Sequence, residues 1–550
     1  MSFLCAFWIA KMNQSRPFIV RIIAVFICAA ALLVPTSAHA YSVLSHEEVV
    51  DMAWKTNIVP MLKQRFPGIS DDEIRQAHAY AYGGSVIQDI GYYPFGSHYF
   101  SDLLHYVRPQ EFVEALIRDS TTPNEYAFAL GALAHFSGDI IGHPAINRIT
   151  AMENPPLRHR FGWIVTYGED PLAHIRTEFG FDVVEVAQGH YSQENYRDFI
   201  GFQVAKSLMD RAFQETYGIP VSSVLTREDM AISSYRRAVS SLIPKMTRLA
   251  FVSYKKEIQQ AAPGMEKRKF LYRLNQTEFK KDFGNEYYRT GFWGHVVAFL
   301  LRMVPKVGPF KGLRVTVPDA QEQTIYIASI NATVDRYRSY LAQVHAASAP
   351  LPPPDPKDAE AARKAADAIA KDATAAQRLA DGAKDAEEKA KLQKAAETVA
   401  KTSEKATAAA DRTEAKVELA LQSGDTQASA NAIPAGTPIK PPTTPILPEL
   451  DLDTGQPSSV GEYALADETY AQLLHQLVQP AGAVSIDGRL EAAIQQFFSH
   501  RVASSAPPPS RKVAKKAAAA AAQVESDLAA LKALPAAALA ENVKPQTIRP

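Results

Sequence analysis

The stretch that most constrains the fold is "ALGALAHFSGDIIGHPAIN", residues 129–147, an apolar helical run that carries three titratable side chains. His135, Asp139 and His143 are spaced four and four. Each step of four residues drifts by only about 40° around a helix, so the three side chains share one face. Burying imidazoles and a carboxylate is costly unless each finds a partner. The chain therefore has to bring other polar groups, or a metal ion, to this face.

The residue after this group is Pro144, and a proline disfavours the helical conformation of the residue before it. We therefore expect the helix to end near His143, which frees this imidazole to turn toward a site.

A second pair lies in "DPLAHIRTEFGFD", where His174 and Glu178 are spaced i, i+4. Asp170 is a plausible N-cap with Pro171 at the first helical position, and we expect Gly180 to end the helix. Helical i, i+4 pairs are a compact way to present two metal ligands.

Two more segments offer similar side chains. In "YSVLSHEEV", Ser45 and Glu48 have the spacing of a capping box, which places His46 in the first turn of a helix. The segment "SVIQDIGYYPFGSHYFSDLLHY" offers one carboxylate and two imidazoles: Asp89, His98 and His105.

Histidine is concentrated in this part of the chain. Nine of the 14 histidines lie between residues 41 and 190: His46, His78, His98, His105, His135, His143, His159, His174 and His190. Imidazole nitrogen and carboxylate oxygen are ligands that zinc accepts readily. The number of candidate ligands exceeds one tetrahedral site and indicates two or three ions, whereas we expect His78, His159 and His190 to be structural.

Residues 1–40 read as a secretory signal peptide. Arg16 and Arg21 precede an apolar run that ends in Ala38-His39-Ala40, a small-residue cleavage site. The alternative is an uncleaved membrane anchor, for which the apolar run is short. Both cysteines, Cys5 and Cys28, lie in this segment, so the mature chain would have to build any metal site from His, Asp and Glu.

The remaining chain divides by composition. Residues 41–348 show helical periodicity and no convincing alternating strand runs in their first part, which predicts an all-α domain. "GLRVTVPD", residues 312–319, is the best strand candidate. The expected helices are 45–65, 71–82, 98–118, 124–143, 170–179, 192–216, 227–260, 276–305 and 320–346.

The C-terminal third is different in character. Residues 349–457 combine Pro-rich linkers with an Ala/Lys/Glu-rich segment that predicts a solvated helix, a weak coiled coil or disorder. Residues 458–503 read as a helical pair that docks on the main domain, and residues 504–550 as a basic, Ala-rich disordered or partly helical tail. The alternative for the whole region is a spacer without chemistry.

With these motifs in order along the chain, the sequence resembles the zinc-dependent phospholipase C family, which is related to the S1/P1 nucleases. The resemblance implies a secreted, all-helical protein with up to three zinc ions. It carries over the ligand order Tyr41 (the freed amine and carbonyl of the first mature residue), His46, Asp89, His98 or His105, His135 with Asp139, His143, and His174 with Glu178. The choice between His98 and His105 stays open, and the family usually begins with Trp where this chain has Tyr41.

The resemblance also distributes these ligands among the ions. It makes Asp139 the bridging carboxylate, with His135, Asp89 and His98 or His105 on one ion and Tyr41 with His46 on another. His143, His174 and Glu178 would hold the third ion.

The implied reaction is hydrolysis of a phospholipid by a zinc-bound hydroxide at a membrane surface, with Asp89 as general base. Tyr92, Tyr93 and Phe95 could offer a cation–π surface to a headgroup, or could equally be core packing. The 59 basic and 59 acidic side chains cancel, so no global charge favours nucleic acid as a partner. A nuclease or other phosphoesterase on the same scaffold and a non-catalytic surface protein remain the alternatives.

Overall fold

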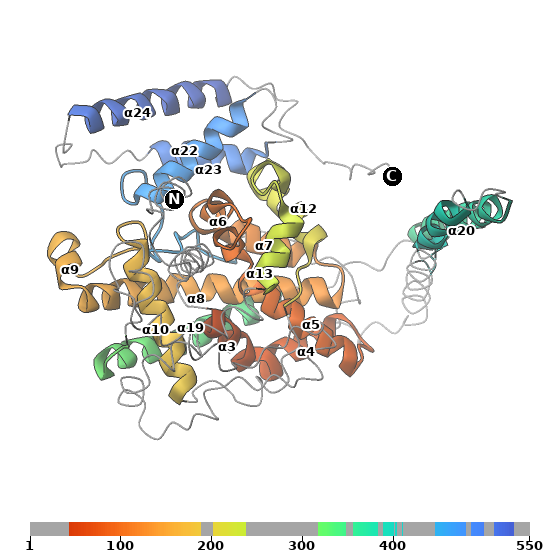
Figure 1. Ribbon diagram of the computed structural model, residues 1–550, viewed down its shortest axis with the longest axis horizontal. Helices are drawn as coiled ribbons and strands as arrows, with labels where there is room; N and C mark the ends of the chain where they lie inside the picture. Colours follow the sequence, from red (N-terminus) through yellow and green to blue (C-terminus); the bar gives the residue numbers. More distant parts are fainter. Residues whose placement is uncertain are drawn as a thin grey trace, which may run out of the picture. The chain divides into compact units, whose positions relative to one another are not determined.

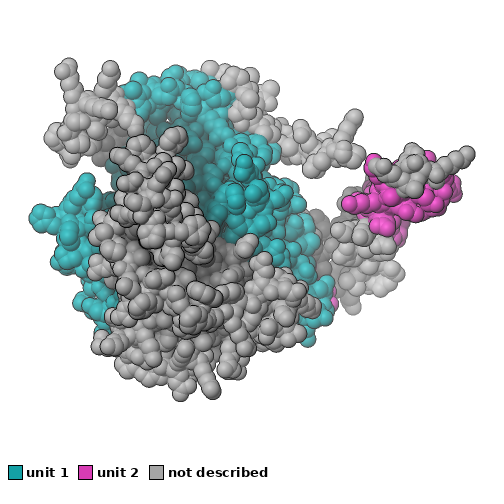
Figure 2. All heavy atoms as spheres, in the orientation of Figure 1, with its two compact units in different colours: residues 1–60, 70–345, 442–550 teal, residues 61–69, 346–441 magenta. Residues whose placement is uncertain are grey.

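The computed structural model describes residues 43–188, 202–237, 317–347, 356–382, 389–400, 446–479, 486–499 and 511–532, with a few residues between 402 and 410. Throughout these ranges the regular structure is helical and contains no strand (Figure 1), which confirms the all-α prediction. The chain forms two compact units (Figure 2). Unit 1 comprises residues 1–60, 70–345 and 442–550, and unit 2 comprises residues 61–69 and 346–441.

Helix α8 (Pro123–Glu153) is the element around which the described part of unit 1 is packed. Its sequence is apolar almost all round, rich in Ala and Gly, and most of its side chains are buried. Such a helix is stable only inside a protein. Its neighbours are α3 (Val43–Ala53), α5 (Asp71–Gly84), α7 (Pro109–Asp119) and α10 (Pro171–Gln188).

Two glycines allow α5 and α8 to approach closely. A Cβ atom at Gly84 would lie 1.9 Å from the Phe128 carbonyl oxygen, and one at Gly131 would lie 2.0 Å from the Ala81 carbonyl oxygen. No larger residue fits at either position without moving a backbone. The close approach brings the end of α5 to the face of α8 that carries the titratable side chains.

The first predicted helix, residues 45–65, is divided into α3, a π-helical turn η1 (Trp54–Ile58) and α4 (Val59–Arg65). The predicted capping box is wrong, because α3 begins at Val43 and Ser45 lies inside it. Starting the helix at Val43 buries this side chain completely. The Ser45 hydroxyl instead contacts the Tyr326 hydroxyl of α19 (Ala320–Ala347).

The predicted helix 98–118 is two helices, α6 (His98–Tyr106) and α7. Pro109 occupies the first turn of α7, where its missing N–H costs nothing. It disfavours a right-handed helical conformation at Arg108, which adopts a left-handed one with φ 50°.

The predicted end of α8 at His143 is wrong, because the helix continues through Pro144 to Glu153. A proline inside a helix costs about 3 kcal/mol. Burial of Ile146 and Ile149, each worth about 1.5–3 kcal/mol, compensates for this cost, since both side chains are fully buried. Packing beyond the proline therefore outweighs the local preference.

The predicted end of α10 at Gly180 is wrong for the same reason, because the helix continues to Gln188. Glycine inside a helix costs only about 1 kcal/mol. The next residue, Phe181, is fully buried and its ring stacks on Tyr326 with centroids 4.2 Å apart. The N-terminal prediction holds, since the Asp170 side chain accepts a hydrogen bond from the Ala173 N–H at 2.9 Å.

Two further helices lie in regions that the sequence predicted to be helical. In the regions predicted as 192–216 and 227–260 the structure has α12 (Lys206–Tyr217) and α13 (Glu228–Arg237). Residues 192–201, 238–260 and 276–305 of the predicted helices lie outside the described residues. Of the strand candidate, residues 317–319 have no regular structure, and residues 312–316 lie outside the described part.

Near the C-terminus, unit 1 contains α22 (Ala464–Val478), α23 (Gly488–Ser499) and α24 (Arg511–Lys532). Helix α22 contacts α6 and α24. The Tyr470 ring of α22 stacks on Phe497 of α23 with centroids 3.8 Å apart. Segments far apart in sequence thus lie side by side in unit 1 (Figure 1).

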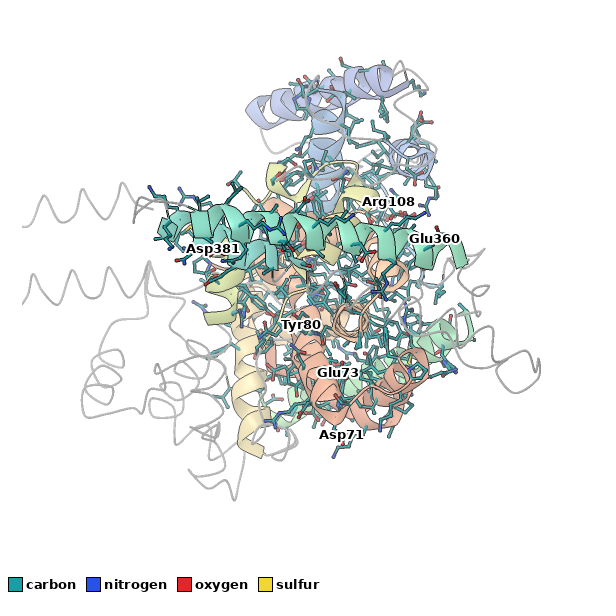
Figure 3. The ribbon with its side chains drawn as sticks, turned by 90° about the vertical axis from the view of Figure 1, so that its right-hand side faces the viewer. Asp71, Glu73, Tyr80, Arg108, Glu360 and Asp381 are labelled. Atoms are coloured by element: carbon teal, nitrogen blue, oxygen red, sulfur yellow. The ribbon has the colours of Figure 1, made fainter. Side chains whose placement is uncertain are left out.

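Unit 2 contains α20 (Pro356–Gly382), an Ala-rich helix. Glu360 and Asp381 lie near its two ends (Figure 3). Lys364 pairs with Glu360 at 2.6 Å, and most described side chains of α20 are exposed. The coiled-coil interpretation of this region stays a prediction. Among all helices in the described ranges, none is both long enough and apolar enough to cross a membrane.

Candidate metal centre

Five elements of unit 1 bring eight titratable side chains to one buried place. Helix α3 supplies one, the 3₁₀ helix η2 (Ile87–Tyr92) one, α6 one, α8 three and α10 two. All eight are at most 2% exposed: His46, Asp89, His105, His135, Asp139, His143, His174 and Glu178. The sequence predicted every one of them.

Asp139 lies at the centre of this cluster. One oxygen, Oδ2, is 2.9 Å from Nε2 of His135 and 3.8 Å from Nε2 of His143, the neighbours one turn away on either side. The same oxygen is 3.4 Å from Nε2 of His105 on α6. Its other oxygen, Oδ1, is 3.5 Å from Nε2 of His46 on α3. Both oxygens of the Asp139 carboxylate therefore face imidazoles.

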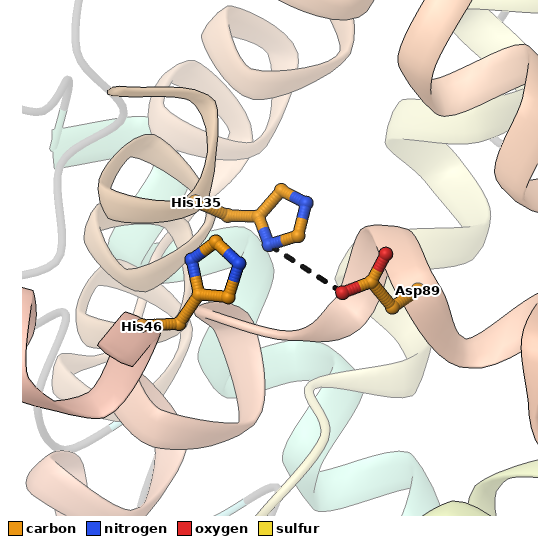
Figure 4. A group of neighbouring side chains, drawn as sticks. All are labelled: His46, Asp89 and His135. Carbon is orange, nitrogen blue, oxygen red and sulfur yellow. Dashed lines mark ion pairs between the residues drawn. The ribbon is translucent and has the colours of Figure 1, made fainter. Parts of the chain in front are cut away.

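Asp89 approaches the same cluster from η2. Its carboxylate lies 3.4 Å from Nε2 of His105 and 4.0 Å from Nδ1 of His135. Figure 4 shows Asp89 opposite His46 and His135, whose rings are stacked with centroids 4.3 Å apart.

A second cluster adjoins the first through His143. Nε2 of His174 lies 2.8 Å from Oε1 of Glu178, one turn further along α10. The His143 and His174 rings have centroids 5.3 Å apart. The side chains form three sets, and within each set the possible ligand atoms lie within 4.8 Å of one another. The sets are His46, Asp89 and His135; His105, His135 and Asp139; and His143, His174 and Glu178.

Two of the imidazoles are held by backbone carbonyls on the side away from the cluster. Nδ1 of His105 lies 2.7 Å from the Ser101 carbonyl oxygen, and Nδ1 of His135 lies 2.9 Å from the Ser85 carbonyl oxygen. An Nδ1–H donated to a carbonyl leaves Nε2 with its lone pair facing the carboxylates. Metal-bound histidines are usually oriented by such a hydrogen bond.

The atoms that face one another do not satisfy one another by hydrogen bonding. Nε2 of His135, both oxygens of Asp139 and both nitrogens of His174 are buried and make no hydrogen bond within the described structure. Leaving such groups buried and unsatisfied is expensive. Nitrogen and oxygen donors packed 2.8–3.8 Å apart without hydrogen-bond geometry fit a divalent cation of the zinc class.

The pKa values reflect this crowding of charge. Burial lowers the pKa of His105, but the carboxylates of Asp139 and Asp89 outweigh it and raise this pKa well above its usual value. Burial raises the pKa of Asp139, but His135 and His143 bring it well below its usual value. For His174, burial dominates and lowers the pKa to about 3. A neutral His174 has the free lone pair that a metal ligand needs.

His98 and His105 separate clearly in the structure. His105 lies in the cluster, whereas His98 is exposed at the first position of α6 and belongs to none of the three sets. The His98 ring makes an edge contact with Tyr92 at 5.3 Å. Tyr41 lies outside the described residues.

The three histidines expected to be structural lie elsewhere or are not described. His78 pairs with Asp51 at 2.9 Å and stacks on Trp54 with centroids 3.8 Å apart. His159 is exposed on α9 (Pro155–Phe161), and His190 lies outside the described residues.

The aromatic residues after Asp89 differ in environment. Tyr92 is buried, and its ring lies 6.0 Å from both His105 and Tyr167. Tyr93 is buried against Tyr235, whereas Phe95 is 52% exposed and adopts a positive φ of 66°.

One buried carboxylate beside the cluster was missed by sequence reasoning. Oδ1 of Asp453 lies 2.7 Å from Nδ1 of His143. Asp453 is 2% exposed and belongs to a region that the sequence left open to be a spacer. Its motif, "LDLDTG", has no ligand spacing to any histidine, so no local signal would have found it.

Comparison with known proteins agrees with this geometry. A family described as zinc-dependent phospholipase C has a sequence model that matches residues 45–227. The matched segment contains all eight residues of the cluster. No curated protein and no solved structure matches the chain.

Proposed function

Because residues 45–227 match the zinc-dependent phospholipase C family, we propose that this protein is a secreted zinc-dependent phosphodiester hydrolase that removes headgroups from phospholipids. The observation that carries the proposal is the set of three adjoining groups of buried His, Asp and Glu side chains in unit 1. Burying so many titratable groups is costly unless they pair with one another or coordinate cations.

The proposed ligand sets are those that the family resemblance implies, with His105 chosen over His98 because it lies in the buried cluster. Asp139 would bridge two ions, one held with Asp89, His105 and His135 and the other with His46 and the freed amine and carbonyl of Tyr41. A third ion would be held by His143, His174 and Glu178. Secretion rests on the sequence of residues 1–40, and cleavage after Ala40 would create the Tyr41 amine.

The chemistry divides between the ions and the protein. Bound zinc ions would supply Lewis acidity toward the phosphate oxygens and lower the pKa of a coordinated water. We propose that Asp89 accepts the proton of the attacking water on a carboxylate oxygen. Ser101 and Ser85 would hold His105 and His135 through their carbonyl groups, so that both rings keep their orientation during the reaction.

Headgroup contact is assigned to the segment after Asp89. Phe95 is the exposed member of the aromatic set proposed from sequence and would meet a cationic headgroup by cation–π contact. Tyr92, whose ring neighbours His105, would form the wall beside the reacting phosphate. Tyr93 would act by holding this segment against Tyr235.

A surface suited to a phospholipid membrane lies on the connection between α8 and α10. We call residues 157–164, "LRHRFGWI", the Arg–Trp patch. It carries no acidic residue, and Trp163 and Ile164 are 61% and 49% exposed. Arg158 and Arg160 lie over the rings of Trp163 and Phe161 at 4.6 and 4.7 Å. Exposed aromatic and aliphatic side chains among cations fit an anionic bilayer surface.

The test is to express the full chain with its own leader and to measure the mature N-terminus, the zinc content per chain and hydrolysis. Phosphatidylcholine vesicles and single-stranded nucleic acid are assayed side by side. We expect two to three zinc ions and release of diacylglycerol. A chain without zinc would overturn the proposal. Degradation of nucleic acid alone would instead identify a nuclease, and zinc without any hydrolysis would identify a non-catalytic protein.

A further inference from the structure

The segment that carries Asp453 belongs to unit 1 and makes hydrogen bonds to α7 and α6. We call residues 446–463 the strap. At one end, the Ile446 and Leu447 N–H groups donate to Oε1 of Glu114 on α7, at 2.8 and 2.9 Å. In the middle, the Leu452 N–H donates to the His105 carbonyl oxygen at 3.0 Å. The strap is therefore attached to the backbone of a residue of the metal centre.

The carboxylate of Asp453 is fully engaged. While Oδ1 faces Nδ1 of His143 at 2.7 Å, Oδ2 accepts hydrogen bonds from the hydroxyls of Tyr106 and Tyr463, the first at 2.9 Å. The Asn147 side chain donates to the Asp453 backbone carbonyl at 2.8 Å, across 306 positions of sequence. These contacts fix both the side chain and the backbone at this residue.

Gly455 of the strap packs against Ile140 and Pro144 of α8, and Pro144 directly follows His143 in the sequence. Pro144 has no N–H to donate to the Ile140 carbonyl, which leaves that part of the α8 surface open. Gly455 occupies it with φ +65°, and a Cβ atom there would lie 2.4 Å from the Ile140 carbonyl oxygen and 3.1 Å from the Pro144 ring. The turn of the strap at Gly455 thus fits against the α8 surface at Ile140 and Pro144, where a residue larger than glycine would not fit.

From these contacts we infer that Asp453 is a positioning residue of the metal centre and that the strap completes this centre. The carboxylate would hold the His143 ring through its 2.7 Å contact with Nδ1, while Nε2 lies 3.8 Å from the Asp139 carboxylate. A carboxylate behind a metal-bound histidine fixes the tautomer and strengthens the ligand. The strap lies outside the family-matched residues 45–227, so nothing in that match assigns it this role.

The inference has a thermodynamic consequence. If the docked strap improves metal binding, then metal binding must stabilise the docked strap by the same free energy. The Leu452 amide, which is closed by the His105 carbonyl, is a local reporter of docking.

Zinc affinity of Asp453 variants in the full chain tests the inference, by titration against a competing chelator. Loss of such a carboxylate typically weakens metal binding 10–100-fold, and we expect this for one ion in Asp453→Ala. Asp453→Asn keeps a side-chain oxygen that can lie against Nδ1 of His143 and should lose less. Asp451→Asn is the matched control, because Asp451 is buried on the same turn but serves Thr454, and it should bind zinc like wild type.

A second variant separates the carboxylate from docking in general. Tyr463→Phe removes one hydrogen bond to Asp453 and leaves the His143 contact in place, so zinc affinity should stay within about threefold of wild type. Equal losses in Tyr463→Phe and Asp453→Ala would overturn the positioning role. Hydrogen exchange of residues 446–456 should slow on adding zinc to wild type and not to Asp453→Ala; unchanged exchange in wild type would contradict the coupling.

The inference rests on the metal centre and not on the choice of phospholipid. A wild-type chain that binds no zinc would overturn the proposed function as well. A wild-type chain that binds zinc and an Asp453→Ala variant that binds it equally well would overturn only the role of Asp453.

Discussion

At the scale of single residues, His98 and His105 are seven positions apart on α6, and only one of the two imidazoles lies in the buried cluster. Both lie on α6, but only His105 is buried and points its Nε2 at Asp89 and Asp139. His98 is the first residue of α6 and is exposed. The sequence alone left the choice between the two histidines open.

These two histidines form a matched pair for mutation. We expect His105→Ala to lose about one zinc ion per chain and to reduce phospholipid hydrolysis at least a hundredfold, since it removes a ligand. His98→Ala should keep its zinc and change hydrolysis by less than fivefold. Metal analysis and initial rates check both variants. The opposite pattern would place His98 in the centre and contradict the geometry.

Glu153 gives a prediction for pH. Burial raises its pKa to about 8, and the Thr177 hydroxyl donates to its Oε2 at 2.6 Å. Below about pH 4 the folded and unfolded chains both carry this proton. As pH rises toward 8 the unfolded chain loses the proton first, so the folded state binds more protons and its free energy of unfolding falls.

Replacing Glu153 with Gln should remove this loss and keep an acceptor for Thr177. We expect Glu153→Gln to be more stable than wild type by at least about 1 kcal/mol at pH 7.5 and equal to it near pH 4. Denaturant unfolding of both chains at the two pH values, with chelator present, provides the measurement. A constant difference between the two chains at all pH values would show that Glu153 does not titrate between them.

At the scale of elements, the Arg–Trp patch lies between α8 and α10, the two helices that carry five of the eight buried titratable side chains. The residues that follow the patch are attached to unit 1. The Val165 N–H donates to the Asn147 carbonyl oxygen at 3.1 Å, and the Tyr167 and His174 rings have centroids 6.0 Å apart. A membrane bound to the exposed tip of the patch would therefore be held at a defined position relative to the centre.

We expect the double variant Trp163→Ala, Ile164→Ala to bind anionic phospholipid vesicles about tenfold more weakly than wild type. It lacks the apolar surface that wild type would bury in the bilayer. Hydrolysis of a soluble monomeric substrate should be unchanged. The control is Met230→Ala, another exposed apolar residue on α13. Vesicle sedimentation at low salt is the assay, and equal binding of the double variant and wild type would exclude the patch as the membrane contact.

At the scale of the whole molecule, the centre ties together elements from both ends of unit 1. Helices α3, α6, α8 and α10 and the strap meet there, across hundreds of residues of sequence. A ligand that binds only the folded state stabilises it in proportion to the logarithm of its concentration over its dissociation constant.

Metal removal should therefore weaken unit 1 as a whole. Zinc at a thousand times its dissociation constant contributes about 4 kcal/mol, so we expect a chelator to lower the main thermal transition by at least about 5 °C. Readdition of zinc should restore it. Calorimetry measures the shift, and in His105→Ala the shift should be smaller. A transition that does not respond to chelator would show that the buried cluster is stable without cations.

The sequence by itself determined the helical class and seven of the eight residues of the cluster, and it offered His105 as one of two candidates for the eighth. Periods of three to four residues and i, i+4 pairs are local, so His135 with Asp139 and His174 with Glu178 could be recognised without a fold. Prediction of the helix ends from the sequence was wrong where packing against distant residues competes with a local preference. Pro144 and Gly180 are helix-ending signals, yet burial of Ile146, Ile149 and Phe181 extends both helices past them.

Only the tertiary structure decided between His98 and His105 and revealed Asp453. Which face of α6 is buried depends on η2, α7 and α22, which the α6 sequence does not encode. The pairing of Asp453 with His143 depends on where the strap docks, and no spacing rule connects residues so far apart. Ligands on one helix are set by the helical repeat, whereas the groups that orient them are set by contacts that exist only once the chain is folded.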